Sequence, residues 1–246
     1  NNADHPESKL VIINFVRNRP YGTFIDRGSK VTIVSTSGHT EPATGWLAYH
    51  IAKLGGFNYI AKEIESDIDN PTSYYNIPDG TKCPNLPLFI EDLKKLADRP
   101  DSWVIPILEA TGLRSRPTQF HFCYNSTKHD SSYNDPTSLV KDYKTFDALY
   151  NHMEQIFKER FDYNCDKNEW YAIGKQNIGH HITASNIFTL RVEAFVWIFD
   201  NRWGSATKTI ADCFHEILEP ERPVEIPYEM EKRQEGHDFG MQDYVD

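Results

Sequence analysis

Apolar positions recur at two spacings along the chain, and the shorter spacing predicts strands. Residues 9–16 form a run of mostly β-branched and aromatic residues that is typical of a strand. Residues 23–26 and 30–35 flank a turn-forming Arg27-Gly28-Ser29 and predict a hairpin or meander. Further strands are predicted at 103–108 and 118–124. The first quarter of the chain is therefore expected to begin as antiparallel sheet.

Helical spacing is found in four other segments. Thr40 and Pro42 mark a helix start, and the following apolar residues repeat at i, i+3 and i+4 until Gly55. Residues 143–161 carry apolar side chains on one face, which predicts an amphipathic helix. A shorter helix is predicted at 88–97, and the length of the apolar segment 182–199 favours a central helix over a buried strand.

Proline and charge divide the remainder of the chain. Residues 67–87 contain four prolines and are expected to form a long irregular connection. Residues 219–246 are acidic and poor in apolar side chains, so they are expected to form an arm or tail. The predicted fold is α+β, with an antiparallel β-sandwich flanked by helices as one globular domain over 1–218.

Composition narrows the class of protein. The 246 residues are 39% hydrophobic and 13% aromatic, which is enough for a sizeable core, and the formal charge is 26 − 36 = −10. This charge disfavours a nucleic-acid backbone as the main partner. No apolar run approaches the ~18 residues of a membrane span, and the first residues are too polar for a signal peptide, although a leader preceding Asn1 is not excluded. The four cysteines form no C-x-x-C pair and are expected to be free thiols.

Several catalytic motifs are missing from the sequence. The glycines match neither G-x-G-x-x-G nor the Walker loop, and no G-x-S-x-G is present. One metal site is conceivable, in which His39, Glu41 and His180 or His181 hold zinc or iron for a metal-dependent hydrolase. Their spacing is not that of H-E-x-x-H, and ten histidines make accidental groupings common, so loop or interface histidines are the favoured interpretation.

Tyrosines in polar surroundings indicate a contact surface. Tyr rings bury area while keeping a hydrogen-bonding tip, which suits protein interfaces. Together with the adjacent histidines after Gly179, they are candidates for self-association. The candidate contact residues are Tyr74, Tyr75, Tyr133, Tyr163, His180 and His181.

Two patches, about 60 residues in all, resemble the cypovirus polyhedrins. The first is Tyr21-Gly22-Thr23-Phe24-Ile25-Asp26 with the strand and helix that follow it. The second runs from Asn177-Ile178-Gly179-His180-His181 through the apolar segment to Asn201-Arg202-Trp203. The chain departs from that family in its short, polar start, which takes the place of an amphipathic helical arm.

The resemblance implies a non-enzymatic viral occlusion-body protein. Such proteins assemble as homotrimers into a crystal in the host cell cytoplasm that encloses and protects virus particles. No cofactor is required, although a nucleotide at subunit contacts is possible in that family. The alternatives are the metal-dependent hydrolase and a secreted binding domain glycosylated at Asn125.

Composition is compatible with release of such a crystal in alkali. Tyr ionises near pH ~10 and Lys loses its charge near ~10.4. High pH would therefore add negative charge to subunits that already carry −10. Packed subunits are then expected to repel one another and the crystal to dissolve.

Overall fold

The structure is a computed structural model that describes most, though not all, of the chain. The described residues are 17–38, 42–64, 73–110, 118–184, 186–193, 196 and 202–223. The strand predicted at 9–16 and nearly all of the arm predicted at 219–246 lie outside them. Within the described ranges, no helix has the length and apolar character needed to cross a membrane.

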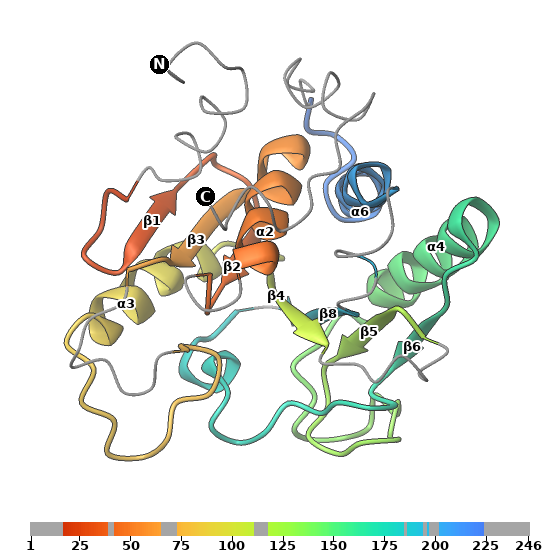
Figure 1. Cartoon of the computed structure of the whole chain (residues 1–246). Coiled ribbons are helices and arrows are strands. Elements are labelled where there is room, and N and C mark those ends of the chain that lie inside the picture. Colours follow the sequence, from red (N-terminus) through yellow and green to blue (C-terminus); the bar gives the residue numbers. More distant parts are fainter. Residues whose placement is uncertain are drawn as a thin grey trace, which may run out of the picture.

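One mixed sheet of eight strands forms the centre of the molecule (Figure 1). Its strand order is β1-β3-β2-β4-β8-β5-β6, with the short β7 paired to β4. The strands are β1 (Gly22–Ile25), β2 (Val31–Ser35), β3 (Asn58–Lys62), β4 (Trp103–Ala110), β5 (Phe120–Cys123), β6 (Cys165–Lys167), β7 (Asn186–Ile187) and β8 (Thr189–Glu193).

The predicted antiparallel sandwich is wrong, because the central strands are parallel. The pairs β3/β2, β2/β4 and β4/β8 are all parallel, whereas β1 and β5 are antiparallel to their inner neighbours. The predicted hairpin is also wrong, since β1 pairs with β3 and not with β2. Both strands were located correctly, but β2 is buried along its whole length, as expected of a parallel strand covered on both faces.

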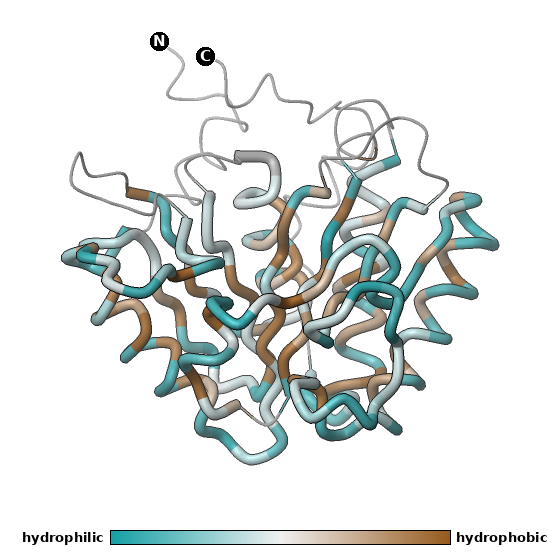
Figure 2. The backbone as a smooth tube through the Cα atoms, turned by 90° about the horizontal axis from the view of Figure 1, so that it is seen from below, coloured by the Kyte–Doolittle hydropathy of each residue, from teal (hydrophilic) through white to brown (hydrophobic). Residues whose placement is uncertain are grey.

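Helices cover the two faces of this sheet. One face packs against α2 (Pro42–Gly55), α4 (Tyr143–Phe161) and α6 (Trp203–Leu218), and we call it the α2 face. The other packs against α3 (Leu86–Ala97) and the irregular segments 73–85 and 168–184, and we call it the α3 face. Figure 2 shows the hydrophobic strands enclosed between more hydrophilic outer segments.

Four predicted elements can be compared directly with the structure. The helices predicted from Pro42 to Gly55 and over 143–161 are confirmed, and the one predicted at 88–97 begins two residues earlier. The helix predicted at 182–199 is wrong over residues 186–193, which form β7 and β8. The cause is burial, because β8 lies inside the sheet, and there an apolar run fits either type of element.

The chain order creates a switch point in the sheet. From β2 the chain passes through α2 on one face to β3, and then through α3 on the other face to β4 on the far side of β2. The connection that leaves β2 therefore runs in one direction across the sheet, and the connection that leaves the adjacent β3 runs in the opposite direction. In open sheets of this kind, ligands bind beyond the carboxyl ends of the strands at such a point.

Candidate functional site at the carboxyl edge of the parallel strands

Polar side chains form a row across the α3 face near the carboxyl ends of the strands. Arg191 is level with Leu108 on one side and with His121 on the other, and His121 is level with Asp166. Continuing the register of β2 by one residue places Thr36 level with Lys62. We call Lys62, Thr36, Arg191, His121 and Asp166 the polar row.

Strand alternation explains why these side chains share a face. The neighbours of His121 and Arg191 along their strands, such as Phe120 and Leu190, belong to the core on the α2 face. Successive side chains of a strand point to opposite faces, so His121 and Arg191 point to the α3 face. Segment 73–77 covers the row, anchored by the hydrogen bond from the Tyr74 amide to the Thr36 carbonyl (2.9 Å).

His121 is held between two carboxylates. Its Nδ1 lies 2.9 and 3.0 Å from the two Asp166 carboxylate oxygens, and its Nε2 lies 2.9 Å from Glu193 Oε1. The imidazole is fully buried, whereas the side chains of Asp166 and Glu193 are 14% and 7% exposed. A doubly protonated ring can donate to both carboxylates at once. The two carboxylates are thus the ends of this arrangement that a ligand can reach.

Charge is concentrated in this buried region. Lys62 is fully buried, with its Nζ 4.9 Å from the Tyr74 ring centroid and 3.3 Å from the Ile64 carbonyl oxygen. Glu193 is buried as well. Burial of charged groups is costly unless they are paired, and such clusters are common at functional sites.

Two hydroxyl groups at the end of β2 have no hydrogen-bond partner among the residues that the structure describes. Ser35 Oγ and Thr36 Oγ1 are buried and have no hydrogen-bond partner among the described residues. Because the two residues are adjacent in the chain as it leaves the strand, their side chains point to opposite faces of the sheet. A Cβ atom on Gly38 would lie 2.9 Å from Ser35 Oγ, so a larger residue at position 38 would require this hydroxyl to move. Buried hydroxyls in proteins normally have partners, which marks this strand end as a place for a polar ligand.

The thiol in this region is not a nucleophile. Cys123 lies on the α3 face beside Arg191, and burial raises the pKa of its thiol to about 12, against the opposing effect of the Arg191 charge. At neutral pH the group is therefore a thiol and not the reactive thiolate. Burial also raises the pKa of the neighbouring Tyr75 phenol.

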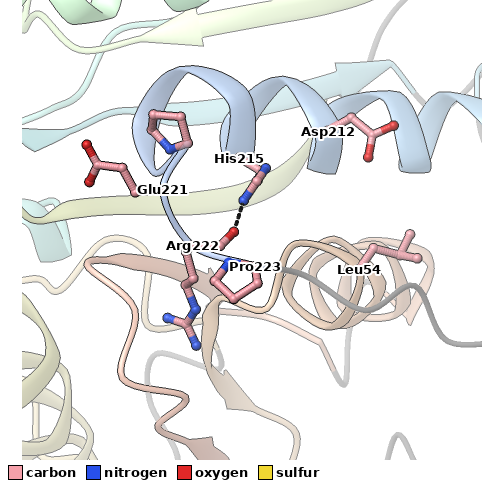
Figure 3. A pocket seen from close by; sticks show the side chains of 7 residues that line it. Leu54, Asp212, His215, Glu221, Arg222 and Pro223 are labelled. Atoms are coloured by element: carbon pink, nitrogen blue, oxygen red, sulfur yellow. Dashed lines mark hydrogen bonds between the residues drawn. The ribbon is translucent and has the colours of Figure 1, made fainter.

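Two surface pockets lie away from the polar row. One is lined by Leu54, Asp212, His215 and residues 220–223, where His215 Nε2 is hydrogen bonded to the Arg222 carbonyl oxygen (Figure 3). The other follows α4 beside Tyr163 and Cys165. Neither contains any of the buried, unpaired polar atoms found among the described residues, so the carboxyl edge is the stronger candidate.

The predicted contact residues are spread over the molecule. Tyr74, Tyr75 and Tyr163 are buried within this chain, and Tyr133 is half-buried. His180 and His181 are exposed in a short 3-10 helix, η2 (Ile178–His181). Of these residues, Tyr74 and Tyr75 border the polar row, through Lys62 and Arg191 respectively.

The alternative metal site is not supported by the structure. His39 and Glu41 lie outside the described residues. Nowhere in the described ranges do three or more His, Cys, Asp or Glu side chains form a group that could hold a metal ion.

Sequence reasoning missed the central residues of this site. The sequence placed His121 only within the strand predicted at 118–124, because its partners Asp166 and Glu193 are 45 and 72 residues away. One signal was present in the sequence. In Thr189-Leu190-Arg191-Val192-Glu193, polar and apolar residues alternate, which is the pattern of a strand with one polar face.

Comparisons with known proteins give a remote structural likeness only. No family model matches the chain, and no curated protein matches it. Two solved structures of isoform 2 of uridine phosphorylase from Schistosoma mansoni are similar. The citrate complex has a TM-score of 0.41 and 11% sequence identity, and the superposition covers 80% of this chain and 90% of the uridine phosphorylase chain. The apo form has a TM-score of 0.38 and 10% identity, covering 80% and 87%.

These findings overturn the predicted relationship to polyhedrins. The sheet is mixed with a parallel centre and is not the antiparallel sandwich that the resemblance implied, and no family model or curated protein links the chain to that family. The prediction of a non-enzymatic, crystal-forming occlusion-body protein rested on that resemblance and is wrong with it. The two patches that carried the resemblance are a strand with its turn and a buried apolar segment, both of which occur in many folds.

Proposed function

We propose that this chain is an enzyme that binds a small hydroxyl-bearing metabolite at the carboxyl edge of the parallel strands. The observation that carries the proposal is His121, hydrogen bonded at both ring nitrogens by the carboxylates of Asp166 and Glu193. Such an arrangement fixes the position of a carboxylate that can exchange a proton with a ligand.

In this proposal Glu193 is the catalytic residue. It is the last residue of β8, at the edge where ligands bind in open sheets. Its carboxylate accepts a proton from a substrate hydroxyl or from water and later returns it. His121 and Asp166 are positioning residues, because the fully buried imidazole touches Glu193 and Asp166.

The hydroxyl groups at the end of β2 support the choice of substrate class. Thr36 Oγ1 lies on the same face as Arg191 and lacks a partner. A ligand with several hydroxyl groups can satisfy Thr36 and Glu193 together, since hydroxyls both donate and accept. Two strand spacings, about 10 Å, separate β2 from β8, which is within the length of a nucleoside or sugar phosphate.

Turnover of defined probes tests the proposal. The panel contains uridine with inorganic phosphate, because uridine is named for the two similar structures, together with ribose and ribose 5-phosphate. Products are followed by mass spectrometry. Glu193→Gln is expected to lower the rate by about 10²- to 10⁴-fold, the usual contribution of acid–base catalysis.

Glu216→Gln provides the matched control for this substitution. Glu216 is an exposed residue of α6 that pairs with His152 on α4, so the same chemical change leaves the site intact. An unchanged rate in Glu193→Gln would contradict the assignment of Glu193. Absence of both binding and turnover across the panel would contradict the substrate class.

A further inference from the structure

The guanidinium group of Arg191 is held by aromatic rings. Its Cζ lies 5.1 Å from the ring centroid of Tyr75 and 4.6 Å from that of Tyr171. Its Nη1 donates a hydrogen bond to the Glu109 carbonyl oxygen (3.2 Å). Tyr75 is fixed in turn by the hydrogen bond between its hydroxyl and that of Thr189 (2.9 Å). The rings therefore keep the guanidinium in one orientation.

Arg191 lacks the carboxylate partner that a half-buried guanidinium normally has. Among the described residues, no carboxylate oxygen forms an ion pair with it, and its Nε is buried without a hydrogen-bond partner. The nearest carboxylates, Asp166 and Glu193, are turned to His121. By contrast, Arg19 pairs with Asp92 at 2.8 Å and Arg99 pairs with Asp26 at 2.5 Å.

We infer that Arg191 recognises an anionic group, a carboxylate or a phosphate, on the ligand of this site. This inference rests on the proposed function and narrows its substrate class from hydroxyl-bearing metabolites to anionic ones. The planar guanidinium matches the geometry of both anions, and an uncompensated buried cation gains most from a bound anion. Its place in the polar row, level with His121, puts that anion beside the catalytic carboxylate and its partners.

Calorimetric titration with inorganic phosphate and, separately, with acetate tests the inference without requiring turnover. Arg191→Gln is expected to weaken binding of the preferred anion at least tenfold, because one charge-assisted contact is lost. Arg202→Gln is the matched control. Arg202 also stacks on two rings, 5.5 Å from those of Phe161 and Tyr163, but it is exposed.

A measurement on the unaltered protein covers the case in which Arg191→Gln fails to fold. Phenylglyoxal modifies arginines, and peptide mass spectrometry reports the rate at each one. Phosphate or acetate is expected to slow modification of Arg191 and not of Arg202. Preference for phosphate assigns a phosphorylated ligand, and preference for acetate assigns a carboxylate ligand. If neither anion binds and neither protects Arg191, the inference is overturned.

The result also separates this inference from the proposed function. Glu193→Gln removes a negative charge near Arg191, so it is expected to abolish turnover without weakening phosphate binding. Anion binding without any turnover would contradict the proposed enzymatic function but not the role of Arg191. Turnover that is unaffected by Arg191→Gln would contradict the role of Arg191 but not the proposed enzymatic function.

Discussion

The carboxyl group of Glu63, the residue that follows β3, makes the stability of the folded protein depend on pH. It accepts hydrogen bonds from Thr23 Oγ1 (2.7 Å) and from the Tyr59 hydroxyl (3.1 Å). Burial nevertheless raises the pKa of this carboxyl group above its ordinary value. The folded state therefore holds the proton more tightly than the unfolded state, and the free energy of unfolding falls as pH rises through that interval.

Glu63→Gln is expected to remove this pH dependence. At neutral pH the variant avoids a buried charge, so its melting temperature rises relative to the unaltered protein. The difference shrinks as pH is lowered from about 7 to about 4, where Glu63 is protonated. Thermal melts over this range measure the effect. The exposed Glu216→Gln is the control, and a constant difference at every pH would contradict the explanation.

The side chain of Asn58 joins the start of β3 to the turn before β2. Its Oδ1 accepts hydrogen bonds from the Arg27 and Ser29 amides (2.9 and 3.2 Å), and its Nδ2 donates to the Ser29 carbonyl and to Thr32 Oγ1 (2.7 and 3.1 Å). All its hydrogen-bonding groups are thus used in a fully buried position. Removing it leaves several backbone groups without partners.

Asn58→Ala is expected to lower the free energy of unfolding by about 3 kcal/mol, since buried groups left unpaired cost about 1–3 kcal/mol each. Chemical denaturation measures the change. The same substitution at Asn76, which is exposed, is expected to cost less than about 0.5 kcal/mol. Equal losses in the two variants would show that the network at Asn58 is unimportant.

At the scale of single elements, helix α4 begins at a side-chain cap. Asp142 accepts a hydrogen bond from the Thr145 amide (3.0 Å) and another from the Thr145 hydroxyl (2.7 Å). These bonds lower the pKa of the Asp142 carboxyl group. A lowered pKa contributes stability that is present above the ordinary pKa of aspartate and is lost as pH falls through the folded value.

Asp142→Ala is expected to cost about 1 kcal/mol at neutral pH, the usual value of an N-cap, and to lower the melting temperature by about 2–4 °C. The cost should decrease as pH falls below the ordinary aspartate pKa of about 4 and through the lowered pKa of the folded state, where the cap becomes protonated. Thermal melts at both pH values check this. Glu159→Ala, an exposed change in the same helix, should have little effect at either pH.

The helices that were predicted correctly have marked ends or an apolar stripe, and the buried strands β2 and β4 were located from their β-branched runs. α2 and α4 carry an apolar stripe, and α3 ends in lysines of its last turn, so spacing and end signals identify them. β8 was predicted as helix, because the length of the apolar segment 182–199 was given more weight than the strand-like alternation of residues 189–193. The strands β3 and β6 and the helix α6 were not predicted at all. Local signals therefore located helices better than buried strands.

At the scale of the whole molecule, neither the order of the strands nor the site could be predicted, because both are set by contacts between residues that are far apart in sequence. β1 and β2 are neighbours in sequence but are separated in the sheet by β3. His121, Asp166 and Glu193 meet because β6 and β8 lie on either side of β5. Pairing between distant strands is set by packing of the complete core. Without knowledge of that packing, an antiparallel arrangement of neighbouring strands was the simplest interpretation.

Hydrogen bonds join the residues that follow α6 to the turn at residues 27–30, which precedes β2. Glu219 accepts hydrogen bonds from the Ser29 hydroxyl (2.5 Å) and the Lys30 amide (3.1 Å), and Arg222 donates to the Arg27 carbonyl oxygen. These contacts join residues about 190 positions apart. They fix the last described helix against the start of β2, at the edge opposite the polar row.

Glu219→Ala is expected to lower the free energy of unfolding by about 2 kcal/mol, since it removes two hydrogen bonds to a charged acceptor. Hydrogen exchange should accelerate in the turn at 27–30 and in the last turn of α6, while α3 keeps its protection because it packs on the other face. Glu221→Ala is the control, as Glu221 is exposed. Acceleration spread evenly over all elements would mean that Glu219 supports the core as a whole and not this one junction.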